Sequence, residues 1–145
     1  MKADNTISKI SRIKEYTNKL IVEELINRGY NGLAPSHGDI IAALLKKGEM
    51  TKTEISNSIC RDRSTVTVLV RKLNELGYLS TRTNEEDSRY SMVFLTEKGK
   101  ELKEDFIEIS EKLYSIQYIG MTEEQIKSFK DGLEMVYDNF KKNNL

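Results

Sequence analysis

Hydroxyl and cationic side chains gather in one short stretch of the chain, residues 61–82. Ser64, Thr65 and Thr67 come first, and Arg71 and Lys72 follow about one to two helical turns later. Hydroxyls donate and accept hydrogen bonds, while guanidinium and ammonium groups bind phosphate oxygens or the acceptor edges of bases. The stretch is therefore locally basic within a chain of zero formal net charge. Its charged residues are Arg61, Arg63, Arg71, Lys72 and Arg82, against Asp62 and Glu75.

An amphipathic helix must present these groups. Asp62 is a good N-cap, Leu76 ends the apolar pattern, and Gly77 stands where a helix C-cap often falls. At about 100° per residue, one face of this helix is apolar and the opposite face carries the hydroxyl and cationic groups. The inward residues are Val66, Leu69, Val70 and Leu73; Ser64, Val68, Arg71 and Glu75 point most directly outward, flanked by Thr65, Thr67 and Lys72.

The flanking elements are short and clearly bounded. Apolar periodicity predicts helices over residues 6–28 and 35–47, and Thr51 with Glu54 has the spacing of a capping box that opens a third helix. Two β-rich runs, 78–82 and 90–95, enclose the polar stretch 83–89 and predict a hairpin. Thr96 is expected to cap one long helix that runs to Gly120. Thr122 with Gln125 predicts the start of a last helix.

This order of elements predicts a winged helix-turn-helix, a mostly α fold with a small β-wing. A helix fits the major groove of duplex DNA, and its inner face must be apolar to hold it against the other helices. We expect a single domain over residues 1–145. Within it, residues 30–100 would form the DNA-binding lobe, and residues 1–29 and 101–145 the dimerisation helices. Arg82 extends the basic surface onto the hairpin, and Val68 would need an apolar partner such as a thymine methyl group.

Residues 61–102 resemble the core of the MarR family of bacterial transcription regulators. The matching pieces are Ser-Thr-Val-Thr at 64–67, Leu73 with Gly-Tyr-Leu at 77–79, Asp-Ser-Arg at 87–89, and Leu-Thr-Glu-Lys-Gly at 95–99. The preceding GLAPSHGDIIAALL is similar to the second helix of that family, and the long terminal helices fall where the family places its dimer interface.

The resemblance implies a role for each matching residue. Arg89 would enter the minor groove, where narrow A·T-rich stretches attract arginine, and Asp87 would support the wing. Ser64, Thr65, Thr67, Val68 and Arg71 would lie in the major groove. The chain departs from the family pattern at Val68, where many members carry arginine, and at Glu85 and Glu86, which make the wing tip acidic.

The apolar stripes of the terminal helices predict a homodimer. Apolar residues recur at three- and four-residue steps in both C-terminal helices. A single slim chain has too few other apolar side chains to cover all of these stripes. Packing within one chain is the alternative explanation. In the predicted dimer, two recognition helices would lie about one DNA turn, roughly 34 Å, apart and read a near-palindrome.

The resemblance also implies a ligand-responsive repressor with a small phenolic or amphipathic effector. His37 could line an effector crevice, although a histidine near a helix start is more often a cap or surface residue. Cys60 lies just before Asp62 and could act as an oxidation switch. Its alternative, which residue statistics favour, is a small buried hydrophobe.

Composition argues against an enzyme. One histidine and one cysteine do not make the usual metal clusters, there is no glycine-rich phosphate loop, and we expect neither cofactor nor metal. A single cysteine and the lack of a signal-like segment favour the cytoplasm, without membrane association. A protein-interaction adaptor with the same fold but without strong DNA binding is the rival function. Zero net charge, Val68 and the acidic wing tip support it.

Overall fold

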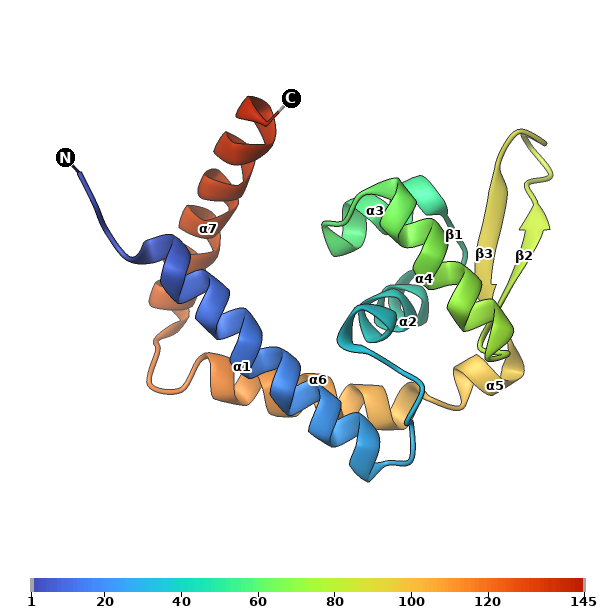
Figure 1. Cartoon of the computed structure of the whole chain (residues 1–145), viewed down its shortest axis with the longest axis horizontal. Helices are drawn as coiled ribbons and strands as arrows, with labels where there is room; N and C mark the ends of the chain where they lie inside the picture. Colours follow the sequence, from blue (N-terminus) through green and yellow to red (C-terminus); the bar gives the residue numbers. More distant parts are fainter. Residues whose placement is uncertain (1, 145) are drawn as a thin grey trace. The chain divides into compact units, whose positions relative to one another are not determined.

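The computed structural model describes residues 2–144 and contains seven helices in that range together with a small antiparallel sheet (Figure 1). Two compact units divide the chain, Met1–Ile109 and Ser110–Leu145, and the boundary falls inside α6. None of the helices in the described range is long and apolar enough to cross a membrane. The elements of the first unit run from α1 to the first half of α6. They are α1 Thr6–Asn27, α2 Pro35–Lys47, β1 Met50–Thr51, α3 Lys52–Ile59, α4 Arg63–Glu75, β2 Leu79–Thr83, β3 Ser91–Leu95, α5 Glu97–Lys100 and α6 Lys103–Gln117.

Side-chain caps define most helix starts, as the sequence predicts. Thr51 and Glu54 form a capping box at the start of α3, and Thr122 and Gln125 form another at the start of α7, Glu123–Asn143. Such a box satisfies backbone N–H groups that have no partner inside the helix. The capping signals in the sequence therefore place these helix starts correctly.

The sheet differs from the prediction by one strand. β3 is its central strand, with β2 on one side and the two-residue β1 on the other, in the order β1-β3-β2. The hairpin pairs Leu79 with Leu95 and Thr83 with Ser91, so the predicted hairpin is confirmed with its strand ends shifted by about one residue. β1 pairs Met50 with Val93, and it was not predicted because two residues carry no detectable periodicity.

The predicted single helix from Thr96 to Gly120 is wrong. Thr96 caps only the short helix α5, a turn at residues 101–102 interrupts the chain, and α6 begins at Lys103. Gly99 lets α5 lie against the backbone before β2, because a Cβ built there would lie 2.2 Å from the carbonyl oxygen of Tyr78. The apolar spacing of Leu102, Phe106 and Ile109 hides this break, since all three are buried.

One hydrophobic core holds the first unit together. The buried face of α4 packs with residues from α2, α3, the sheet and α6, and Figure 1 shows α4 beside the β2–β3 hairpin. Burying one valine, leucine, isoleucine or methionine side chain stabilises a fold by roughly 1.5–3 kcal/mol relative to leaving it exposed. The most deeply buried side chains are Leu25, Ile40, Ile41, Leu44, Met50, Ile55, Val66, Val70, Leu73 and Val93.

A polar cluster joins the end of α1 to α6. Arg28 donates to Asp105 at 2.7 Å and to Glu108 at 2.8 Å, and the hydroxyl of Tyr30 donates to the other oxygen of Asp105. The Tyr30 hydroxyl and the Arg28 guanidinium hold the pKa of Asp105 below its usual value. Burial and the nearby Asp105 raise the pKa of Tyr30 to about 12.

Substitution of Gly99 by alanine should destabilise the protein by about 2 kcal/mol or more, because backbone must move to admit the Cβ. Urea unfolding monitored by circular dichroism measures the change. Gly32→Ala is the matched control, since its Cβ would meet only side-chain atoms of Leu76 at an ordinary 3.7 Å. The control should stay within about 0.5 kcal/mol of the wild type. Equal effects of the two substitutions would contradict the close approach.

Asp105→Asn should lower the free energy of unfolding at pH 7 by about 1 kcal/mol, because the carboxylate is only partly shielded from water. The pKa of Asp105 is lowered in the folded state, so its stabilisation is complete above the unfolded pKa near 3.9. It is lost as pH falls through the lower folded pKa.

Urea unfolding between pH 7 and pH 3 measures this dependence. The difference between wild type and Asp105→Asn should narrow toward the acid end of the range. Glu104→Gln on the same helix serves as the control. A difference that stays constant with pH would show that the variant acts through packing rather than charge.

Candidate nucleic-acid interface

The exposed face of α4 carries the side chains that the sequence singles out. Ser64, Val68, Arg71 and Lys72 are exposed, while Thr65 and Thr67 are half-buried beside them. The opposite face, with Val66, Val70 and Leu73, is buried as predicted. Leu69, predicted to face inward, is half-buried. α4 therefore presents one polar and cationic face whose direction is fixed by the core beneath it.

The start of α4 is organised by Asp62. Its carboxylate accepts from the backbone N–H of Thr65 at 2.7 Å and from the hydroxyl of Ser64 at 2.7 Å. These bonds, the backbone bond first, hold the pKa of Asp62 below its usual value. Thr67 donates its hydroxyl to the carbonyl of Arg63 at 3.0 Å. The hydroxyls of Ser64 and Thr67 thus have intramolecular acceptors, and their oxygens remain able to accept from a ligand.

The turn between α3 and α4 is fixed by contacts that the sequence does not indicate. Arg63 donates to the hydroxyl of Thr53 at 3.0 Å, and Ser56 hydrogen-bonds the carbonyl of Arg61. Arg63 is therefore an anchor between α3 and α4, although sequence analysis counted it only as part of the basic bias. Since its partner is ten residues away, no short motif could identify it.

Val68 is an exposed apolar residue in the middle of this polar face. Its side chain is 60% exposed, and Arg71 lies about one turn further along the helix. Leaving an isolated valine in water costs little, so exposure alone needs no explanation. Its position nevertheless places two methyl groups on the exposed face of α4, between the hydroxyl side chains and the cationic side chains.

Arg82 does not stand free at the base of the hairpin. Its guanidinium binds Glu49 through two hydrogen bonds, with Nε 3.1 Å from Oε1 and Nη2 bonded to Oε2. This pair lowers the pKa of the Glu49 carboxyl. Sequence analysis assigned Arg82 to DNA contact and missed Glu49, because 33 residues separate the partners. Arg82 would have to leave Glu49, or be shared with it, to bind phosphate.

The β2–β3 hairpin, called the wing below, ends in a loop ordered by Asn84. The Asn84 side-chain oxygen accepts from the N–H groups of Glu86 and Asp87, and the Asn84 N–H donates to the carbonyl of Tyr90 at 2.9 Å. Sequence analysis did not single out Asn84, although asparagine in a polar turn is a known signal.

Arg89 lies at the wing tip with 81% of its side chain exposed. It pairs with Asp87, whose Oδ2 is 2.7 Å from Nη2, and Asp87 also accepts from the Arg89 backbone N–H. The Arg89 guanidinium holds the pKa of Asp87 below its usual value. Asp87 therefore pairs with an arginine within the wing, and this pairing also orients Arg89. Glu85 and Glu86 are exposed beside it, so the acidic wing tip is real.

His37 and Cys60 have local explanations. The Nδ1 of His37 accepts from the backbone N–H of Ala34 at 3.0 Å, which is the capping role that the sequence favoured. Burial, and then the charge of Lys72, lower the pKa of His37. Cys60 ends α3 with φ of 55° and is exposed, so the interpretation of Cys60 as a buried hydrophobe is wrong. A left-handed residue at a helix end lies on a surface turn rather than in the core. A redox role for Cys60 remains a prediction.

Comparison with known proteins identifies relatives of this site. The model of the MarR family matches residues 33–90, which run from the start of α2 to the wing. The HTH-type transcriptional repressor IacR of Pseudomonas putida is 31% identical over 100 residues. That match covers 69% of this chain and 60% of the length of the relative.

Two solved structures extend the likeness over nearly the whole chain. A MarR transcriptional regulator from Methanosarcina mazei Go1 is 25% identical, with a TM-score of 0.75, over 96% of this chain and 99% of that one. A MarR family regulator from Listeria monocytogenes, complexed with 26mer DNA, is 20% identical with a TM-score of 0.83 over 99% of this chain and 92% of that one. At 20% identity, the likeness to the Listeria monocytogenes structure is a likeness of fold.

Proposed function

Because the chain belongs to the MarR family, we propose that it is a transcription regulator that binds double-stranded DNA in a sequence-specific manner as a homodimer. The observation that carries this proposal is the exposed face of α4, with its hydroxyls, Val68, Arg71 and Lys72, beside a wing that ends in Arg89. One relative is named a transcriptional repressor, and one structure of the same fold is complexed with DNA. Repression is the mode we propose.

Each element would have a defined part in this function. α4 would enter the major groove, with Ser64, Thr65 and Thr67 close to the DNA and Val68 against a thymine methyl group. Arg71 and Lys72 would reach bases or phosphates. Of the residues that the structure describes, none forms an ion pair with either cation, so both are available to an anion. Arg89 would exchange Asp87 for the minor groove.

The apolar surface of α7 supports the dimer. Phe129, Leu133, Tyr137 and Phe140 recur at helical spacing and are all exposed, and none of the described α7 side chains, residues 123–143, is buried. α1 likewise exposes Ile7, Ile10 and Ile13. Contiguous exposed apolar side chains mark interaction surfaces. A second copy would cover them and place two recognition helices roughly 34 Å apart.

A protein-interaction adaptor remains a second candidate. Two wing-side arginines, Arg82 and Arg89, already have carboxylate partners, and Glu85 and Glu86 are exposed at the wing tip. These charges would suit a protein surface better than a phosphate backbone. The two functions differ in salt dependence, because DNA binding releases condensed counterions.

DNA binding is tested by fluorescence anisotropy with duplex DNA from upstream of the gene for this chain, in a salt series. We expect Kd to rise steeply with salt, and Arg71→Ala and Arg89→Ala each to weaken binding by about 1–3 kcal/mol. Lys9→Gln on α1 is the charge-matched control, because it removes one exposed cation far along the chain from α4. It should change Kd less than either arginine variant.

Failure of the folded protein to bind at low salt would redirect the test to fragments selected from the whole genome. Absence of binding there as well would contradict DNA recognition and favour the adaptor. Equal losses in all three variants would show a non-specific charge effect rather than a defined interface.

The dimer is tested by light scattering at micromolar concentration. We expect about twice the chain mass of 16.7 kDa. Leu133→Glu should shift the population toward monomer, because a charge would replace an apolar contact at the centre of the stripe. Glu134→Gln, on the neighbouring exposed position, is the control and should leave the dimer intact. A wild-type mass near 16.7 kDa would contradict the proposal.

A further inference from the structure

The turn between α1 and α2 carries the one Asn-Gly pair of the sequence, Asn31 and Gly32. Both residues are exposed, and the turn is closed by the N–H of Leu33, which donates to the carbonyl of Tyr30 at 3.3 Å. This distance is longer than usual for a backbone hydrogen bond, so the bond opposes a change of turn conformation only weakly. Water therefore reaches a weakly held peptide group between Asn31 and Gly32.

Gly32 leaves the approach to the Asn31 carboxamide open. Glycine has no side chain to keep its backbone nitrogen away from a neighbouring group. Of the residues that the structure describes, none accepts a hydrogen bond from the Gly32 N–H. The Gly32 nitrogen can therefore lose its proton to solvent and attack the Asn31 Cγ, with which it closes a five-membered ring.

We propose that Asn31 is a site of spontaneous deamidation in the folded protein and that isoaspartate is the main product. A bond forms between the Gly32 nitrogen and the Asn31 Cγ, the bond from Cγ to Nδ2 breaks, and ammonia leaves with a proton from water. Water then opens the succinimide ring. Attack at Cγ yields aspartate, and attack at the main-chain carbonyl carbon yields isoaspartate. Water is the only co-reactant, and no atom is oxidised or reduced.

Every other asparagine is followed by a residue with a side chain. Asn84, in the wing loop, is the closest comparison, and its Oδ1 already accepts from the N–H groups of Glu86 and Asp87. Most of the others lie within helices, where backbone hydrogen bonds hold the following peptide group. These helical asparagines are Asn18, Asn27, Asn57, Asn74, Asn139 and Asn143. The reaction should therefore be selective for Asn31.

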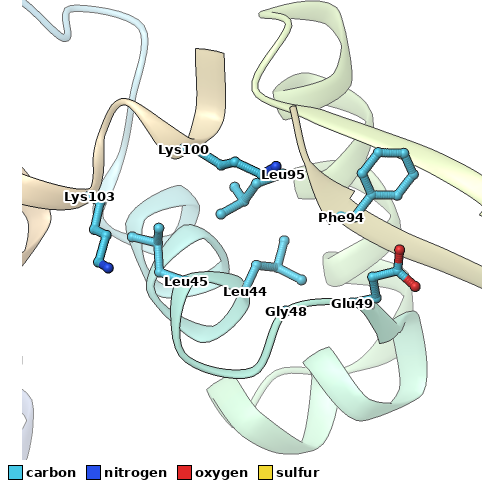
Figure 2. A pocket seen from close by; sticks show the side chains of 8 residues that line it. All are labelled: Leu44, Leu45, Gly48, Glu49, Phe94, Leu95, Lys100 and Lys103. Atoms are coloured by element: carbon cyan, nitrogen blue, oxygen red, sulfur yellow. The ribbon is translucent and has the colours of Figure 1, made fainter. Parts of the chain in front are cut away.

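Isoaspartate would lengthen the main chain between two fixed points, because the chain then passes through Cβ and Cγ. Before the turn, the hydroxyl of Tyr30 donates to Asp105, and after it Leu33 is buried. α2 follows directly, and Figure 2 shows its far end, where Leu44 lies beside Leu95 of β3. Since both leucines belong to one core, α2 cannot move to absorb the added atom without a loss of packing.

The reaction also adds a negative charge three residues after Arg28. The Arg28 guanidinium already binds the carboxylates of Asp105 at 2.7 Å and Glu108 at 2.8 Å. A further carboxylate near this group would meet the repulsion of two like charges. We therefore expect the modified chain to be less stable than the unmodified one.

The reaction is measured on the folded chain, incubated at neutral pH in water enriched in heavy oxygen and then analysed by mass spectrometry. Trypsin places Asn31 in the peptide 29–46 and Asn84 in the peptide 83–89, each without another asparagine. We expect Asn31 to convert several-fold faster than Asn84, with uptake of heavy oxygen. A methyltransferase specific for isoaspartate should label the peptide 29–46. Equal rates at the two asparagines would overturn the site, and a peptide that takes up heavy oxygen without labelling would overturn the product.

Gly32→Ala tests the attack by the backbone nitrogen. Its Cβ would meet the Leu76 side chain at an ordinary 3.7 Å, so the variant should fold, while the added methyl group hinders ring closure. The variant should slow conversion of Asn31 several-fold and leave Asn84 unchanged. The chain unfolded in urea gives the intrinsic rate, to which the rate in the folded wild type should be comparable. An unaffected Gly32→Ala variant, or folded-state protection of Asn31 as strong as that of Asn84, would overturn the proposal.

The structural consequence is tested by urea unfolding of the isoaspartate form, separated by ion exchange from unmodified chains of the same sample. We expect a lower unfolding midpoint, and a smaller shift for Asn31→Asp, which has the charge without the added main-chain atom. An unchanged midpoint would overturn the strain at the turn. An equal shift for Asn31→Asp would assign the effect to charge and overturn the role of the lengthened chain. These measurements do not depend on the proposed function, since none of them involves DNA.

Discussion

The close approach of Gly99 to the carbonyl oxygen of Tyr78 is the constraint on which the arrangement of the first unit depends. It brings α5 against the chain between α4 and β2. There the ammonium group of Lys98 donates to the carbonyl of Leu76, the C-cap of α4, and the hydroxyl of Thr96 donates to the carbonyl of Gly77. The end of α4, the start of the wing and the entry to α6 are therefore held at one point. The direction of the exposed face of α4 relative to the wing follows from this junction, since both elements leave it with no flexible linker between them.

Charge at the proposed interface is arranged before any ligand arrives. Arg63 is bound to Thr53, Arg82 to Glu49 and Arg89 to Asp87. An arginine held in this way must give up its partner to bind phosphate. For Arg82 and Arg89, exchange of a carboxylate for a phosphate yields less affinity than the capture of phosphate by an unpaired arginine would. In the proposed complex, Arg82 and Arg89 would therefore add less affinity than Arg71 and Lys72, which form no ion pair with the residues that the structure describes.

Local signals made most of the fold predictable. The capping boxes, the Asp62 cap and the apolar stripe of α4 depend on residues three or four positions apart, and the structure contains all of them. The features that sequence analysis missed depend on residues far apart or on backbone contact. β1 is too short to show a period, the break before Lys103 lies beside the backbone contact of Gly99 with Tyr78, and the Glu49–Arg82 pair spans 33 residues. The candidate site was thus predictable in composition but not in its internal pairing.

Because the apolar face of α7 is exposed, the stability of this helix would depend on the concentration of the protein. Within the described chain none of the side chains of this 21-residue helix is fully buried, and a helix with little tertiary packing is only marginally stable in water. Any stability that it gains from a second copy rises with concentration by mass action. Newly made or scarce chains would then carry a frayed α7, and proteases cut frayed segments first. Turnover would fall as copies accumulate, so the molecule would set a lower limit on its own useful concentration.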